Sequence, residues 1–145
     1  MRISDLLRHK DANGTGEVWT LPPDATVREL LAALAEHHIG AMVVTDGDAL
    51  RGIVSERDIV RRLHTDGDTV LTLTIDELMT TDVVHGTPEA TVDDVATLMT
   101  ERRIRHLPVL DHDRLVGVVS IGDVVSSRMR ELEHDREQLQ NYISG

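Results

Sequence analysis

The sequence predicts an α/β protein in which a β-α-β-β-α unit occurs twice and a C-terminal helix follows. The first observation is an internal repeat: a shift of 65 positions places residues 23–27 on 88–92 and residues 54–58 on 119–123, with many identical side chains and no gap. The second is that each copy has one stretch with a helical apolar period and short apolar runs on either side. Together they predict two pseudo-symmetric repeats.

The first half of each copy is expected to be a strand followed by a helix. The strands are predicted at residues 17–21 and 82–86. Thr26 and Thr91 then stand where helix N-cap residues are expected, each with an acidic side chain three positions later. The helices that follow carry apolar residues at positions 27, 30, 31 and 34, or 92, 95, 96 and 99, which lie on one helical face.

The second half of each copy is expected to be a hairpin and a second helix. Strands are predicted at 41–45 and 50–54 in the first copy, and at 107–110 and 115–119 in the second. Ser55 and Ser120 then open the second helices. Asp58 and Asp123 fall in the first turn of those helices, where a negative charge suits the helix dipole.

The segments outside the repeats are predicted from similar signals. Residues 3–7 and 75–79 are expected to be helical lead-ins related by a shift of 72, so the first copy carries an insertion of 72 − 65 = 7 residues. Its Gly and Asn residues predict a loop at 10–16, and 64–69 is expected to be a polar linker. The tail is expected to be a charged helix with an apolar stripe at Met129, Leu132, Leu139 and Tyr142/Ile143.

Composition narrows the possible functions. The net charge of −11 argues against a general partner among nucleic acids or anionic membranes, because both are polyanions. No apolar run approaches the roughly 20 residues of a membrane span, and the first residues lack the apolar core of a signal peptide. We therefore expect a cytoplasmic protein. The chain has no cysteine, its eight histidines form no metal-binding pattern, and no nucleophile–base order is visible, so neither a metal site nor an enzyme is predicted.

Two seven-residue segments, GIVSERD at 52–58 and GVVSIGD at 117–123, resemble the signature of cystathionine-β-synthase (CBS) domains. The segments at 39–44 and 104–109 resemble the family as well. The chain is therefore similar to stand-alone proteins made of one tandem CBS pair. The resemblance implies residues 1–64 as the first repeat with its lead-in helix, 65–127 as the second repeat with its lead-in helix, and 128–145 as a charged C-terminal helix.

The resemblance also implies a function, namely a compact, non-catalytic regulatory pair that binds AMP, ATP, NAD or a related adenine nucleotide in clefts between the repeats. No obligatory cofactor is expected. The pair is expected to form a homodimer and, since no output domain is visible, to regulate an unidentified protein target in trans. The alternative is a protein-interaction scaffold whose nucleotide clefts are empty or vestigial.

The residue types in the signatures suit an adenosine ligand. A carboxylate such as Asp58 or Asp123 can accept both hydroxyls of a ribose, and a serine at a helix N-terminus lies beside free backbone N–H groups that suit phosphate. Arginine offers bidentate contacts to phosphate. The expected ligand-binding residues are Thr20, Ile39, Gly40, Ala41, Ser55, Arg57, Asp58, His85, Arg105, His106, Pro108, Ser120 and Asp123.

Several of these residues, and the signature glycines, also have a simpler interpretation. Ser followed three residues later by Asp is an ordinary N-cap motif, and Gly52 and Gly117 could serve the backbone conformation alone. Arg57 could form a surface ion pair, and residues 105–106 could be surface charge. Because the two halves differ at these positions, either one cleft binds more tightly or one ligand draws on both halves. The apolar stripe of the tail favours a dimer contact over a site for another partner.

Overall fold

The computed structural model describes residues 1–144 and divides the chain into two compact units. The first-repeat unit comprises residues 18–85 and 110–116, and the second-repeat unit comprises residues 1–17, 86–109 and those from 117 onwards. The N-terminal lead-in therefore belongs to the unit of the second repeat, whereas the lead-in at 75–79 belongs to the unit of the first. The α/β class and the doubled unit predicted from the sequence are confirmed.

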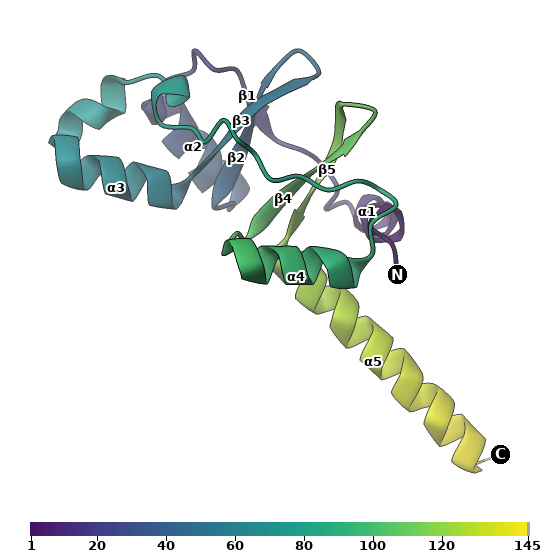
Figure 1. Ribbon diagram of the computed structural model, residues 1–145. Helices are drawn as coiled ribbons and strands as arrows, with labels where there is room; N and C mark the ends of the chain where they lie inside the picture. The colour runs from purple at the N-terminus through teal and green to yellow at the C-terminus, as the bar shows by residue number, and fades with distance from the viewer. Residues whose placement is uncertain (145) are drawn as a thin grey trace. The chain divides into compact units, whose positions relative to one another are not determined.

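The first-repeat unit is built on a three-stranded sheet in the order β1-β2-β3. β1 (Thr20–Leu21) runs parallel to β2 (Ala41–Asp46), which pairs antiparallel with β3 (Ala49–Ser55) through a hairpin. The helices are α2 (Val27–His37) and α3 (Glu56–Asp66), with 3₁₀ turns at Gly67–Thr72 and Ile75–Glu77 (Figure 1). All of them contribute side chains to one apolar core, whose buried members include Leu30, Met42, Val54, Ile59, Val70 and Ile75.

The second-repeat unit repeats the pattern with a different lead-in. It contains α1 (Ile3–Ala12), α4 (Val92–Arg102) and α5 (Ile121–Ser144). β4 (His106–Asp111) and β5 (Arg114–Ser120) form a two-stranded hairpin, of which residues 106–109 and 117–120 belong to this unit. Figure 1 shows α4 beside the first turns of α5, whose remaining turns extend away from this unit. The buried side chains come from each of these elements and include Ile3, Leu6, Val95, Met99, Leu107, Val119 and Val124.

The two main repeat helices, α2 and α4, begin and end in the same way. Thr26 accepts a hydrogen bond from the Glu29 amide, and Thr91 accepts one from the Asp94 amide, each over 3.1 Å. At the other end, His38 and Arg103 both adopt φ = 54°, a left-handed conformation that closes the last turn of a helix. The predicted N-caps are confirmed.

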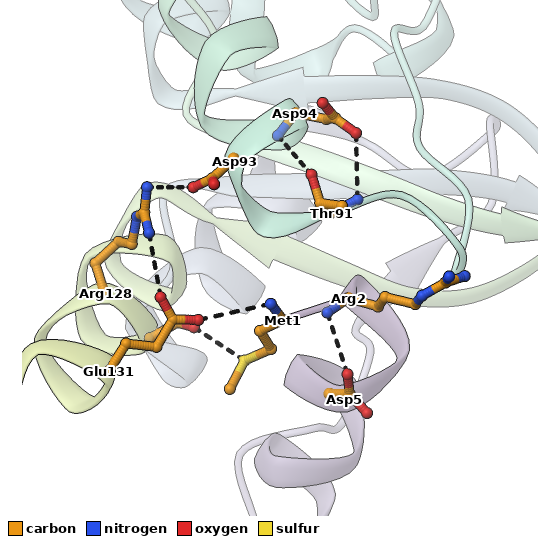
Figure 2. Close-up of polar contacts among 9 residues, drawn as sticks. Met1, Arg2, Asp5, Thr91, Asp93, Asp94, Arg128 and Glu131 are labelled. Atoms are coloured by element: carbon orange, nitrogen blue, oxygen red, sulfur yellow. Dashed lines mark hydrogen bonds and ion pairs between the residues drawn. The ribbon is translucent and has the colours of Figure 1, made fainter. Parts of the chain in front are cut away.

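Polar contacts fasten the chain start to α4 and α5 within the second-repeat unit. Arg128 bridges two acids, pairing with Asp93 at the start of α4 and with Glu131 over 3.1 Å (Figure 2). Glu131 in turn lies 3.7 Å from the Met1 backbone nitrogen. The Val92 amide donates to the Met1 carbonyl over 2.9 Å, so the first residues are part of the packed unit.

Four local predictions were wrong. The loop predicted at 10–16 starts later, because α1 continues to Ala12 and Gly14, at φ = 73°, turns the chain after it. The strand predicted at 17–21 is limited to Thr20–Leu21, the residues that pair with β2. The strand predicted at 82–86 forms only an isolated bridge from Gly86 to Val109. The linker at 64–69 is largely helical, since α3 runs to Asp66 and a 3₁₀ turn follows.

The lead-in at 75–79 also differs in type, since it is a 3₁₀ turn over Ile75–Glu77 in place of a longer helix. The charged C-terminal helix is continuous with the helix that Ser120 opens, so α5 includes both the signature and the tail. Residue 145, the last residue of the predicted C-terminal segment, lies outside the described residues.

Candidate functional site

Ser55 and Asp58 form a reciprocal capping box at the N-terminus of α3. The Ser55 amide donates to Asp58 Oδ2 over 2.8 Å and the Ser55 hydroxyl donates to the same oxygen over 3.1 Å, while the Asp58 amide points at Ser55 Oγ over 3.4 Å. Both residues are half-buried. Within residues 1–144, Asp58 Oδ1 makes no hydrogen bond and the carboxylate has no ion pair. The N-cap interpretation is thus correct locally, and it leaves one acceptor oxygen available.

Ser120 and Asp123 form the equivalent arrangement at the start of α5. The Ser120 amide donates to Asp123 Oδ2 over 2.8 Å and the Asp123 amide donates to Ser120 Oγ over 3.1 Å. A third partner makes this copy different, because Lys10 Nζ donates to Asp123 Oδ2 over 2.8 Å. The two aspartates are therefore held alike by the backbone, but their electrostatic surroundings differ.

The segments before β2 and β4 are fixed to the same helix starts. The Glu56 amide donates to the Gly40 carbonyl over 3.0 Å, and the equivalent Ile121 amide donates to the Arg105 carbonyl over 2.8 Å. These bonds bring residues 39–41 beside Ser55, as the sequence prediction required. A Cβ atom on Gly40 would meet the Glu56 carboxyl group at an ordinary 3.7 Å, so close packing does not demand a glycine there.

The remaining predicted residues fall into the two units separately. Thr20, on β1, pairs with Val43 of β2 and is exposed in the first-repeat unit, which also holds His85. His106 and Pro108 lie on β4 in the second-repeat unit, where the Pro108 carbonyl accepts a hydrogen bond from Gly86 over 2.9 Å. The predicted residues thus divide between the two units, with His85 in the unit of Asp58 and His106 and Pro108 in the unit of Asp123.

Arg57 and Arg105 are the predicted phosphate donors. Both side chains are exposed, and within the described part of the chain neither forms an ion pair. The alternative interpretation of Arg57 as a surface ion-pair residue is therefore not supported by the contacts of residues 1–144. Both guanidinium groups remain available to an anionic ligand.

The signature glycines have a packing role that the sequence did not reveal. A Cβ atom on Gly52 would lie 2.7 Å from Met79 Sδ and 2.8 Å from the Thr80 carbonyl oxygen. A Cβ atom on Gly117 would lie 2.6 Å from Leu7 Cδ2. Leu7 and Met79 are equivalent residues of the two lead-ins, since the shift of 72 relates them. The missing Cβ at each glycine therefore leaves the space into which the lead-in of the same unit packs.

Two further features went unrecognised in the sequence. Lys10 is the sole lysine of the chain, and its long-range contact with Asp123 could not be read from neighbouring residues. Trp19, the sole tryptophan, stacks on His37 with ring centroids 3.6 Å apart and planes at 11°. Each residue is the sole one of its type in the sequence, which marks it as unusual but does not indicate that Lys10 contacts Asp123 or that Trp19 stacks on His37.

Two α/β repeats, each with a Ser–Asp capping box at the start of its second helix, define a paired-repeat module. A family model described as "CBS domain" matches residues 4–65 and 75–130. The chain belongs to the CBS-domain family, as the signature resemblance predicted. No helix within residues 1–144 is long and apolar enough to span a membrane.

Relatives of known sequence support the assignment. The mitochondrial CBS domain-containing protein CBSX3 of Arabidopsis thaliana is 34% identical over 148 residues, which is 99% of this chain and 72% of the relative. The CBS domain-containing protein YhcV of Bacillus subtilis is 34% identical over 115 residues, which is 79% of this chain and 81% of that protein.

Solved structures show the same fold. A CBS-domain protein of Agrobacterium tumefaciens superposes with a TM-score of 0.82 at 38% identity, covering 88% of this chain and 99% of that one. The CBS domain pair of protein MJ0100, in complex with methylthioadenosine and S-adenosyl-L-methionine, gives a TM-score of 0.75 at 27% identity and covers 92% of this chain and 98% of that pair.

Proposed function

We propose that this CBS pair is a non-catalytic regulatory module that binds an adenine nucleotide and signals in trans to a separate protein. The observation that carries the proposal is the arrangement of Asp58. Its carboxylate is held at the start of α3 by the Ser55 amide over 2.8 Å, and its second oxygen makes no hydrogen bond within residues 1–144. A fixed carboxylate with an available oxygen is a suitable acceptor for ribose hydroxyls.

The surroundings of Asp58 suit the rest of such a ligand. Residues 39–41 lie beside the start of α3 because of the hydrogen bond between Gly40 and Glu56, and they offer backbone groups and small side chains to a base. Arg57 is exposed and without an ion pair in the described residues, so its guanidinium can contact a phosphate bidentately.

The structurally similar CBS pair of MJ0100 supports the choice of an adenosine-containing ligand. Its two bound molecules, methylthioadenosine and S-adenosyl-L-methionine, share an adenosine group. Base and ribose are therefore the groups that both ligands share. We accordingly assign recognition of the shared group first to Asp58 and Asp123, the proposed ribose acceptors, and only second to the arginines. AMP, ADP, ATP and NAD carry the same group with phosphates, and the free guanidiniums of Arg57 and Arg105 favour these anionic forms.

Calorimetric titration of the purified protein with AMP, ADP, ATP and NAD, each up to millimolar concentration, tests the proposal. We expect saturable binding of at least one of them, together with an increase in the thermal unfolding midpoint that follows ligand concentration. The absence of heat and of any thermal shift for all four ligands would refute nucleotide binding and would favour the scaffold alternative.

The scaffold alternative is favoured by the far part of α5. Met129, Leu132, Leu139, Tyr142 and Ile143 are 58 to 85% exposed. Exposed apolar side chains at roughly heptad spacing are typical of helices that pair with another helix. Truncation after Glu133 keeps the contacts of Arg128 and Glu131, and capture of a protein partner that is lost in this truncated chain while nucleotide binding persists would assign signalling to the tail.

We further propose that the partner of this stripe is a second copy of the chain, which makes the protein a homodimer. Light scattering after size exclusion tests this: the full chain should have twice the mass of the monomer, and Leu132→Lys with Leu139→Lys should return it to 16.1 kDa. A monomeric full chain would contradict the dimer. No obligatory cofactor is part of the proposal, and the cytoplasmic location remains a prediction from the sequence.

A further inference from the structure

Lys10 connects the end of α1 to the Asp123 half of the candidate site. Its ammonium group donates to Asp123 Oδ2 over 2.8 Å and to the Val118 carbonyl oxygen over 2.9 Å. The side chains of Lys10 and Asp123 are 18% and 22% exposed, so the pair is largely shielded from solvent. A charge-assisted hydrogen bond in such a place is stronger than a bond between neutral groups.

The first repeat handles the same positions differently. Ile53, which the 65-residue shift places on Val118, has its carbonyl oxygen bound by the Thr80 backbone amide over 2.9 Å. Asp58, which falls on Asp123, has no ion pair within residues 1–144. The ammonium group of Lys10 thus takes the place of a backbone donor in the second repeat, and at the same time it supplies a positive charge that Asp58 lacks.

We propose that Lys10 is a specificity-determining residue: its ammonium group occupies Asp123 and thereby weakens the binding of a ribose diol to that carboxylate. Oδ2 of each aspartate accepts two hydrogen bonds, one of them from a serine amide, but the second donor is the rotatable Ser55 hydroxyl at Asp58 and the charged Lys10 ammonium group at Asp123. A ribose that binds Asp123 through both carboxylate oxygens must displace the ammonium group, whereas a ribose that binds Asp58 displaces no ion pair. The Asp58 half therefore binds first, and the inequality of the two halves originates at Lys10.

This inference rests on the proposed nucleotide function, and its test isolates the Asp123 half. Asp58→Asn weakens the first half while keeping an amide oxygen for the Ser55 amide. In that background, Lys10→Met is compared with Arg8→Met, which removes an equal charge from α1 at a side chain that is 76% exposed and pairs with Asp5. Adenosine is the probe because it carries the ribose diol without a phosphate, and 2′-deoxyadenosine lacks the diol.

We expect Lys10→Met to raise adenosine affinity about tenfold, the factor that corresponds to one charge-assisted hydrogen bond. Arg8→Met should leave it unchanged, and 2′-deoxyadenosine should gain nothing from either substitution. If Lys10→Met destabilises the fold, Lys10→Gln removes the charge while keeping a donor for Val118, and it should give a gain in the same direction.

Equal or weaker adenosine binding after both Lys10 substitutions would overturn the inference, because Lys10 would then be a structural cap or a direct ligand contact. That result leaves the proposed function intact if the otherwise unchanged protein still binds a nucleotide. Failure of the unchanged protein to bind any of the four nucleotides or adenosine is a different result, and it would overturn both the proposed function and the inference.

Discussion

Met79 packs directly over Gly52: its Sδ atom lies 2.7 Å from the position that a Cβ atom on this glycine would occupy. The Thr80 carbonyl oxygen, at 2.8 Å from the same position, adds a backbone obstacle. At Gly117 the nearest atoms all belong to the side chain of Leu7, at 2.6 to 3.4 Å. A side chain can move aside more easily than a backbone carbonyl that is hydrogen bonded. Gly117 should therefore tolerate substitution by alanine better than Gly52.

Gly52→Ala should therefore lower the free energy of unfolding by about 2 to 3 kcal/mol, and Gly117→Ala by about 1 kcal/mol, the range for overpacked interiors. Urea denaturation measures both. Gly40→Ala is the matched control, since its Cβ would meet only ordinary contacts at 3.7 Å and beyond, and stability there should hardly change. Equal losses at all three glycines would contradict the packing explanation.

Ser120→Ala should lower the free energy of unfolding by about 1 kcal/mol, because the Asp123 amide loses the hydroxyl that caps it over 3.1 Å. Ser126→Ala, the same substitution at an exposed position on α5, serves as control and should be nearly neutral. Thermal unfolding of the two variants side by side is the measurement. If Ser126→Ala lowers the free energy of unfolding as much as Ser120→Ala does, the capping hydroxyl makes no specific contribution to stability.

Arg128→Ala should have a small effect that disappears in salt. Its guanidinium links Asp93 on α4 to Glu131 on α5, but half of the side chain is exposed, so the free-energy loss should stay below about 1 kcal/mol. At about 1 M salt, where the screening length is near 3 Å, the difference from the unchanged protein should vanish. Arg136→Ala, which removes an exposed cation with no ion pair in the described residues, should show no salt-dependent difference.

Trp19 should report on its stacked neighbour by fluorescence. The indole is 37% exposed, and the His37 ring covers one of its faces with centroids 3.6 Å apart. His37→Ala should therefore shift the emission maximum to longer wavelength, because water replaces the imidazole, while His64→Ala, at an exposed position on α3, should not. An unchanged spectrum for His37→Ala would mean that the rings are not stacked in solution.

The features predictable from the sequence were those set by residues close together in the chain. Ser55 and Asp58, or Thr91 and Asp94, are three positions apart, so capping chemistry alone identifies the helix starts. The internal repeat then predicted both copies of the fold, whereas the ligand-binding role of the expected site residues stays a prediction. The length of the first strand was harder to predict, because β1 extends only over Thr20 and Leu21, the residues that pair with β2.

Features that depend on distant contacts could not be read in this way. The bond from Lys10 to Asp123 joins residues 113 positions apart, and α1 continues through the predicted loop up to Ala12. The packing of Leu7 on Gly117 likewise depends on which repeat accepts each lead-in, and no local pattern indicates that choice. The different residues of the two halves predicted that they bind unequally, and the contact of Lys10 with Asp123, on which the proposed reason for it rests, could not be read from the sequence.

In the proposed function, the Asp58 carboxylate at the start of α3 binds the ribose of an adenine nucleotide. The most direct measurement is calorimetric titration of whichever of the four nucleotides binds most tightly into Asp58→Asn, with Asp68→Asn, an exposed acid in the same unit, as the control. We predict that Asp58→Asn weakens binding at least about tenfold, the effect of losing one charge-assisted hydrogen bond, with only a small decrease in the unfolding midpoint, and that the control binds normally. Undiminished binding by Asp58→Asn would contradict the account.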